Sequence, residues 1–177
     1  METCTECGFE PTAITVEETP GLIRRFAALH REWLIGFAAD EVRRGELRVR
    51  PCSGVWSPLE YAGHLRDVCA LFDRRVQAVL RAPGSTLEVI DHDAVVARGG
   101  YDRLDPRALA AGLGACADRL ATRMEGVGPE QWSLYGVRAG ERRTIAEIAK
   151  RAVHEGRHHL MDVERILASS SGASMRR

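Results

Sequence analysis

Three histidines and two acidic residues lie within a short segment near the C-terminus, from His154 to Asp162. The surrounding hydrophobic residues recur at helical spacing, and side chains four positions apart on a helix point in the same direction. The segment therefore offers two separate pairs with the spacing of metal ligands, His154 with His158 and Glu155 with His159. A metal centre needs three or four protein ligands, so a pair that binds metal has to meet ligands from elsewhere in the chain.

The position of each pair relative to the hydrophobic face of this helix decides between them. Advancing about 100° per residue places these residues on one side: Ile145, Ala149, Ala152, Gly156 and Val163. Glu155 and His159 fall at the edge of this face, whereas His154 lies nearly opposite it and is expected to face solvent. His64, in an earlier helix, also lies at the edge of a hydrophobic face.

A set of His64, Glu155 and His159 gives two imidazoles and one carboxylate. These donors suit a catalytic divalent metal with an open position for water or substrate. Zinc is the metal we expect, with nickel, iron and manganese as alternatives. At each position, a hydrogen-bonded structural histidine is the alternative to a ligand.

Cys4 and Cys7 form a second pattern, which is half of a zinc knuckle. The other three cysteines are isolated, so the sequence does not supply the second half. The pair could complete a tetrahedral site with His30 or His92 or across a dimer, could act as a redox pair, or could belong to an ordinary tail. An acid on each side of His92 makes a further metal-like cluster, for which solvated acids are the alternative.

Four amphipathic helices have to position these residues. The hydrophobic spacing and capping signals predict helices over about 20–42, 58–80, 106–124 and 145–168. Residues 43–56 and 84–104 are predicted to be loops, and no segment alternates convincingly like a strand. The pattern predicts an all-α four-helix bundle with long interhelical connections. It spans residues 16–168, between a Cys-x-x-Cys extension over 1–15 and a disordered tail over 169–177.

The composition limits the classes of partner. Lys and Arg together number 25 in the 177 residues and are balanced by 25 Asp and Glu, which argues against a general nucleic-acid or anionic-membrane binder. An arginine-rich stretch over residues 43–50 is confined to one predicted loop. No apolar run is long enough for a membrane helix and no signal-peptide pattern is present, so we expect a cytoplasmic protein with neither nucleic-acid nor membrane partners. Five cysteines favour free thiols or metal ligands over disulfides.

Two segments resemble motifs of the DinB-like superfamily. Residues Trp56–Leu65 resemble its second-helix motif, in which Trp-Ser is followed by an acid and then by the first metal histidine. Residues Glu155–His159 resemble its fourth-helix motif, which places two ligands four positions apart. Many members have histidine at both positions, whereas glutamate at the first position is similar to the mycothiol-dependent maleylpyruvate isomerase branch. The resemblance covers roughly residues 16–168 and implies the same three ligands as the helix-face argument.

The resemblance implies a four-helix bundle, often a homodimer, with a divalent metal at its open end. It also implies a metal-dependent thiol S-transferase or isomerase that uses mycothiol, bacillithiol or glutathione, with a small-molecule electrophile as the second substrate. The N-terminal cysteine pair, and the absence of room for a domain after residue 168, put maleylpyruvate in doubt as the substrate.

Three hypotheses for the function remain. A metal-bound thiol loses its proton near neutral pH and becomes a nucleophile, which gives the thiol transferase. The same ligands activating water would give a metal-dependent hydrolase. A non-catalytic binding or stress protein on the same scaffold is the third hypothesis.

Three further residues are assigned supporting roles. The candidate catalytic residues are Asp162, which would orient a metal ligand, and His158, which would bind substrate. A surface ion pair and a plain surface position are their respective alternatives. Arg66 closely follows the first predicted ligand and is the candidate for binding an anionic substrate or cofactor, with solvated charge as its alternative.

Overall fold

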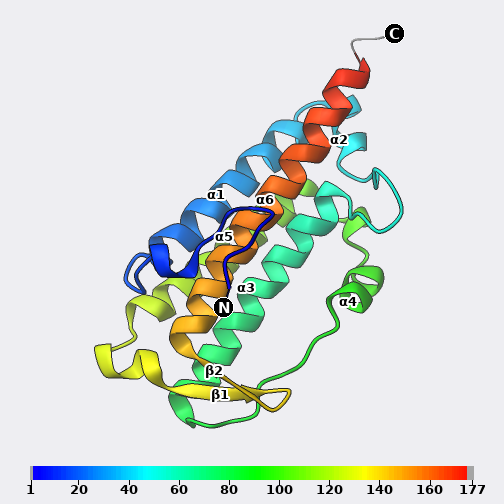
Figure 1. Ribbon diagram of the computed structural model, residues 1–177. Coiled ribbons are helices and arrows are strands. Elements are labelled where there is room, and N and C mark those ends of the chain that lie inside the picture. The colour runs from blue at the N-terminus through cyan, green and yellow to red at the C-terminus, as the bar shows by residue number, and fades with distance from the viewer. Residues whose placement is uncertain (1, 175–177) are drawn as a thin grey trace.

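The computed structural model describes residues 2–174, and its body is a bundle of four long helices (Figure 1). These helices are α1 (Thr19–Ala38), α3 (Pro58–Arg81), α5 (Pro106–Glu125) and α6 (Ile145–Ser174). The connections contain the short helices α2 (Glu41–Glu46) and α4 (His92–Gly99), and the strands β1 (Tyr135–Arg138) and β2 (Glu141–Thr144). The predicted four-helix bundle is confirmed. None of the described helices is long and apolar enough to cross a membrane.

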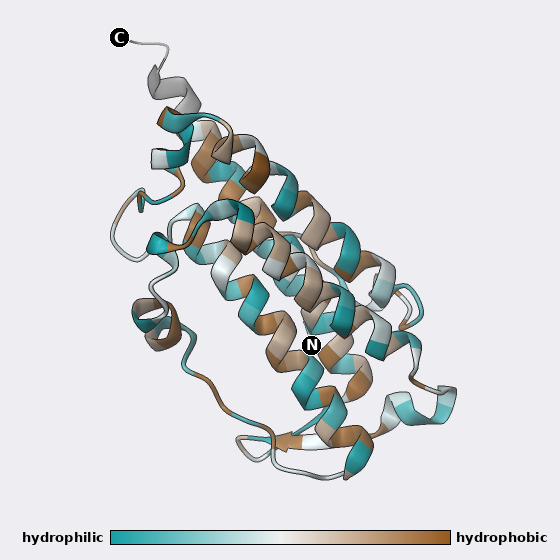
Figure 2. Ribbon diagram, turned by 180° about the vertical axis from the view of Figure 1, so that it is seen from behind, coloured by the Kyte–Doolittle hydropathy of each residue, from teal (hydrophilic) through white to brown (hydrophobic). Residues whose placement is uncertain are grey.

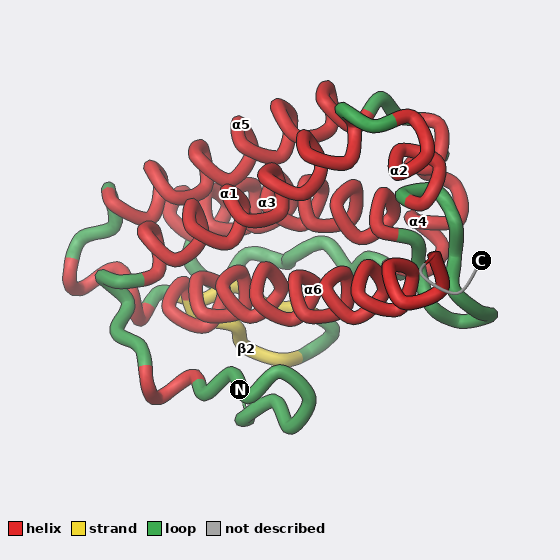
Figure 3. The backbone as a smooth tube through the Cα atoms, turned by 90° about the horizontal axis from the view of Figure 1, so that it is seen from above, coloured by secondary structure: helices red, strands yellow, loops and turns green. Residues whose placement is uncertain are grey.

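The long helices are not arranged in simple chain order. α1 and α6 run in one direction, and α3 and α5 run in the opposite direction (Figure 1). α1 packs mainly on α5 and α6, and α3 packs mainly on the same two helices, so α1 and α3 lie diagonally across the bundle. Figure 3 shows α5 and α6 on opposite sides. Because α3 and α5 run parallel, the chain between them has to return along the bundle, which explains the long connection over residues 82–105.

The helices α3 and α6 both begin at a capping box. The Ser57 side chain accepts from the backbone N–H of Glu60, whose carboxylate accepts in return from the backbone N–H of Ser57. Thr144 and Glu147 form the same reciprocal pair. Each box satisfies N–H groups that would otherwise lack partners in the first turn. Both boxes lie where the sequence predicts them, and they fix the start of the helices that carry the candidate ligands.

Hydrophobic side chains from all four long helices form the core. Figure 2 shows hydrophobic and hydrophilic residues interspersed along each long helix, as an amphipathic bundle requires. The largest fully buried apolar side chains are Leu34, Leu47, Leu59, Leu71, Leu109, Leu113, Leu120, Met124, Ile145, Val76 and Val79. Burying one such side chain contributes roughly 1.5–3 kcal/mol, so packing of the helix faces dominates the stability.

The chain between α5 and α6 contains a β-hairpin, and the prediction that no strand is present was wrong. β1 and β2 pair antiparallel, with Tyr135 opposite Thr144. Ala139 and Gly140 between them have φ of 50° and 82°, the positive values typical of a two-residue hairpin turn. Strands of four residues are too short for their alternation to stand out in the sequence.

The predicted loops and tail also contain helical turns. Asp40 caps α2 by accepting from two backbone N–H groups, and Asp91 caps α4 in the same way by accepting from one. Helices of one or two turns show too little periodicity to be recognised. α6 continues to Ser174, beyond its predicted end. The rest of the predicted tail, residues 175–177, lies outside the described residues.

The N-terminal extension is folded against α6. Phe9 is only 2% exposed, and Pro11 is buried in the short 3-10 helix η1 (Pro11–Ala13). The Lys150 ammonium of α6 donates to the carbonyl of Pro11 at 2.8 Å. Figures 1 and 3 both show the N-terminal segment beside α6. The extension therefore covers a face of α6 that would otherwise be exposed to solvent.

Candidate metal centre

His64 from α3 meets Glu155 and His159 from α6 at the inner edge of the bundle. One donor atom from each residue lies within 4.8 Å of the other two. Oε2 of Glu155 is 3.3 Å from Nε2 of His159 and 3.6 Å from Nε2 of His64. The His64 side chain is 4% exposed and the other two are 13% exposed, so the set is largely removed from water. The structure thus brings together the three residues that the sequence analysis selected.

Close packing between α1 and α6 fixes the helical turn that carries two of these ligands. Gly156 lies against α1, where an added Cβ would come within 2.8 Å of the Cβ of Phe26. His30 of α1 is fully buried, and its Nε2 lies 3.1 Å from the carbonyl oxygen of Gly156. A carbonyl only accepts, so Nε2 of His30 carries the proton in this bond. α1 therefore holds α6 next to Glu155.

Neighbouring side chains orient the donor atoms of the centre. Oδ2 of Asp162 is 3.2 Å from Nδ1 of His159, so Nδ1 carries a proton and Nε2, which faces Glu155, is the nitrogen that would bind a cation. Nε of Arg151 donates to Oε1 of Glu155 at 2.7 Å, so Oε2 of the same carboxylate faces the imidazoles. The contact between Asp162 and His159 is the one that the predicted orienting role of Asp162 requires, and the role itself stays a prediction.

The electrostatics of the centre favour an ionised carboxylate. Burial alone would raise the pKa of Glu155, but hydrogen bonds with His159 and His64 and the charge of Arg151 hold that pKa well below its usual range. Burial alone would lower the pKa of His159, but the carboxylates of Asp162 and Glu155 raise it above its ordinary value. Two imidazoles and an ionised carboxylate form a donor set that fits a divalent cation, which would displace the proton from His159.

Aromatic rings cover part of the centre. The ring of Trp56 lies 5.0 Å from that of His64, and the ring of Tyr61 lies 5.1 Å from that of His159, measured between centroids. On another side, His92 of α4 meets His64 edge to face at 4.9 Å. Three protein ligands leave room in the coordination shell of a metal for water or substrate.

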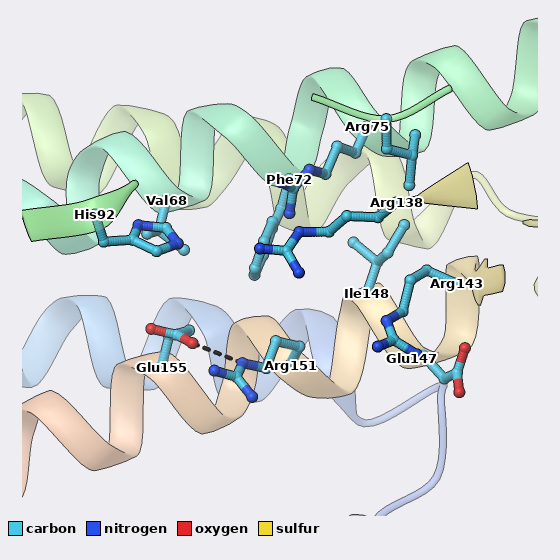
Figure 4. A pocket seen from close by; sticks show the side chains of 11 residues that line it. Val68, Phe72, Arg75, His92, Arg138, Arg143, Glu147, Ile148, Arg151 and Glu155 are labelled. Atoms are coloured by element: carbon cyan, nitrogen blue, oxygen red, sulfur yellow. Dashed lines mark hydrogen bonds and ion pairs between the residues drawn. The ribbon is translucent and has the colours of Figure 1, made fainter. Parts of the chain in front are cut away.

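A pocket of about 180 Å³ opens beside Glu155 (Figure 4). Glu155 and His92 lie at one end of it, and four arginines contribute to its lining: Arg75, Arg138, Arg143 and Arg151. Figure 4 shows Arg138 reaching from β1 into the space between α3 and α6. Nε of Arg75 is buried without a hydrogen-bond partner among the described residues. Burial lowers the pKa of Arg75 to about 10, so its guanidinium stays charged at neutral pH.

Sequence reasoning missed these arginines because α3, the hairpin and α6 each contribute some of them. Arg151 carried a signal, since it lies one helical turn before Glu155 on the same face. Arg66, the predicted anion-binding residue, is not part of the pocket lining, and its Nε donates to Asp67 at 2.7 Å. His158 does not face the pocket either, and its Nδ1 lies 3.6 Å from Sγ of Cys4.

The expectation that His154 faces solvent was wrong. Both of its ring nitrogens are buried, because the N-terminal extension covers this face of α6 and places the ring of Phe9 at 5.3 Å. His30 and His92, which were considered as partners for the cysteine pair, lie elsewhere and contact Gly156 and the candidate centre. The cysteine pair instead approaches His158 and His154.

Comparison with known proteins agrees with this fold. The structure is similar to that of YfiT from Bacillus subtilis, described as a probable metal-dependent hydrolase with an unusual four-helix bundle topology. The TM-score is 0.78 at 14% identity, over 88% of this chain and 87% of that one. It is also similar to the mycothiol-dependent maleylpyruvate isomerase, with a TM-score of 0.67 at 17% identity, over 88% of this chain. The match covers 63% of the isomerase, less than two thirds of its length.

At these identities the structural likenesses establish the fold alone. A search of curated proteins gives no match. The family model of the DinB superfamily matches residues 37–163, a segment that contains all three residues of the candidate centre. The chain therefore belongs to the DinB superfamily.

Proposed function

We propose that the chain is a divalent-metal-dependent thiol S-transferase that uses a low-molecular-weight thiol, such as mycothiol or bacillithiol, and an anionic electrophile. One observation carries the proposal: Glu155 belongs both to the three-residue centre and to the arginine-lined pocket. A thiol bound at the centre would therefore lie beside an anion bound in the pocket. The structural likeness to a mycothiol-dependent enzyme supports the choice of thiol.

His64, Glu155 and His159 would hold the metal. A divalent metal bound there would lower the pKa of a coordinated thiol, so that the nucleophilic thiolate forms near neutral pH. His92 lies against His64 and lines the pocket, which places it to accept the thiol proton. Burial, with a smaller effect from the charge of His64, lowers the pKa of His92, so its imidazole is neutral and able to accept at pH 7.

The arginines would bind the electrophile. Guanidinium groups match carboxylates in shape and charge, and Arg75 lines the pocket with an Nε that has no hydrogen-bond partner among the described residues. Arg138 reaches into the space between α3 and α6 (Figure 4). When the electrophile has an activated double bond, the thiolate sulfur would bond to one carbon as the double bond opens, and the proton held by His92 would then pass to the neighbouring carbon. For a substrate with a leaving group, the displaced group takes the electron pair.

The proposal is tested with zinc-loaded protein, one thiol at a time and a panel of carboxylate-bearing electrophiles, with the adduct followed by mass spectrometry. We expect adduct formation above the uncatalysed rate and its loss in His159→Ala. Removing one charge-assisted contact costs about 1.5–3 kcal/mol, so Arg138→Gln should raise KM for these electrophiles roughly 10- to 100-fold. Arg142→Gln is the matched control, because Arg142 is on the same hairpin but stacks on Tyr135 outside the pocket lining.

The same experiment separates the competing functions. Turnover that needs no thiol and incorporates water would overturn the transferase and favour a metal-dependent hydrolase. Absence of turnover with every thiol and electrophile, in protein shown to carry metal at the centre, would favour a non-catalytic binding protein. The homodimer that the resemblance implies stays a prediction, which analytical ultracentrifugation of the metal-loaded protein tests.

A further inference from the structure

Four potential zinc ligands from two distant parts of the chain meet where the N-terminal extension covers α6. They are Cys4, Cys7, His154 and His158, and one donor atom from each lies within 4.8 Å of the others. We call these residues the cysteine–histidine set. Sγ of Cys4 is already 3.6 Å from Nδ1 of His158. Neighbouring donors of a tetrahedral zinc site lie roughly 3.3–3.8 Å apart, so small side-chain movements would close the set around an ion.

His154 provides an independent observation. Both of its ring nitrogens are buried, and neither has a hydrogen-bond partner among the described residues. Leaving a buried polar group without a partner costs about 1–3 kcal/mol, so such a histidine requires an explanation. A metal ion bound to one of the two nitrogens supplies the missing partner. The adjacent ring of Phe9 gives the site an apolar wall.

His158 is oriented as a metal ligand would be. Its Nδ1 faces Cys4, and its Nε2 lies 3.6 Å from a carboxylate oxygen of Glu6 and 3.7 Å from one of Asp162. Metal-binding histidines commonly place their second nitrogen beside a carboxylate, which fixes the ring and makes the bound nitrogen more basic. The same oxygen of Asp162 contacts His159 of the candidate metal centre, so one carboxylate serves both sets.

The extension is folded so that it presents both sulfurs to α6. The backbone N–H of Gly8 donates to the carbonyl of Cys4, and the N–H of Cys4 donates to the carbonyl of Phe9, both at 2.9 Å. Gly8 has φ of 64°, a left-handed conformation that a residue without a Cβ adopts most readily. These bonds close a compact turn around Cys7. The C-x-x-C spacing of Cys4 and Cys7, combined with two histidines four positions apart on a helix, is a common spacing of zinc ligands.

We propose that the cysteine–histidine set binds one zinc ion through four protein ligands and thereby fastens the N-terminal extension to α6. A redox pair would need only the two thiols, whereas here two histidines converge on them. Four protein ligands leave no open position, which is the arrangement of a structural zinc site. α6 would then carry two metal sites, using residues 154 and 158 for one and residues 155 and 159 for the other. The inference does not depend on the proposed enzymatic activity.

Cobalt(II) substitution tests the proposal in the full, reduced chain, because thiolate ligands give cobalt a near-ultraviolet charge-transfer band. The candidate metal centre has no sulfur ligand, so the band reports on the cysteine–histidine set alone. We expect the band in the native protein and in His159→Ala, and its loss in the double variant Cys4→Ser/Cys7→Ser. The matched control is Cys52→Ser, which alters an exposed cysteine outside the set. Absence of the band in the native protein, or its persistence in the double variant, would overturn the proposal.

A second measurement avoids variants that fail to fold. The native protein is alkylated with and without zinc, and the modified positions among its five cysteines are mapped by mass spectrometry. We expect zinc to protect Cys4 and Cys7 together and to leave the reactivity of the exposed Cys52 unchanged. In the variant His154→Ala, the zinc affinity of the cysteine–histidine set should fall, while the candidate metal centre still binds its own ion. Equal alkylation of the pair with and without zinc would refute the site.

Discussion

Replacing His30 should change how the stability of the fold depends on pH. This histidine is fully buried, and its Nε2 donates to the carbonyl of Gly156. Its Nδ1 is buried without an acceptor among the described residues, so a second proton would have no partner there. Burial lowers the pKa of His30 to about 4. An exposed histidine in the unfolded chain has a pKa of about 6.5.

The sign and size of the effect follow from these two values. Between pH 6.5 and pH 4 the unfolded state binds more protons at His30 than the folded state does, so the free energy of unfolding rises with pH. The stabilisation from the neutral imidazole is fully present above pH 6.5 and is lost as the pH falls. The loss amounts to about 2 kcal/mol at pH 5 and about 3 kcal/mol at pH 4.

The assay compares the native protein with His30→Gln, which keeps an N–H donor but does not titrate. Urea unfolding of both, freed of metal with a chelator, is followed by circular dichroism from pH 7 to pH 4. The difference in unfolding free energy between them should change by about 3 kcal/mol over this range. Groups common to both proteins cancel in the difference, as does any constant packing cost of the glutamine. A difference that stays constant with pH would refute the reasoning.

Three further predictions follow from the packing and the metal sites. Gly63→Ala should lower the unfolding free energy by about 1–3 kcal/mol, because the added Cβ would lie 2.5 Å from the ring of Tyr101. In the control Gly21→Ala the added Cβ meets no atom within 4 Å and should not destabilise the fold, so equal urea midpoints for the two variants would contradict the prediction. Asp162→Asn should weaken zinc binding at the candidate metal centre by about 10- to 100-fold, because His159 loses the carboxylate that orients it. Competition titrations measure this affinity, and an unchanged affinity would exclude the orienting role of Asp162. Free zinc at one hundred times the Kd of a site should raise the unfolding free energy over that of chelated protein by about 3 kcal/mol for each site that it fills. Identical thermal midpoints with and without zinc would show that the folded state does not bind it.

Much of the fold could be predicted from the sequence because α3 and α6 carry strong local signals. The capping residues at Ser57 and Thr144 mark where these helices begin, and helical spacing then determines which side chains share a face. That is sufficient to place His64, Glu155 and His159 at the edges of the hydrophobic faces of their own helices, and the structure then shows that the two helices bring the three residues together. Each of these inferences depends only on residues within one helix.

The features that could not be predicted depend on contacts between distant segments. His154 lies opposite the hydrophobic face of its own helix, and its ring nitrogens are buried because a segment at the other end of the chain folds over them. Helical periodicity carries no information about that cover. Likewise Arg138 enters the pocket only because a hairpin with four-residue strands turns it inward. The N-terminal segment and the hairpin strands are both too short for their sequence patterns to stand out from chance.

The central claim is that one divalent metal binds between α3 and α6, and anomalous X-ray diffraction tests it most directly. Crystals of the full chain grown with zinc are measured on both sides of the zinc absorption edge. We predict an anomalous peak about 2.0–2.2 Å from Nε2 of His64, Nε2 of His159 and a carboxylate oxygen of Glu155, and its loss in His159→Ala. Zinc-saturated crystals without a peak between these three side chains would contradict the claim.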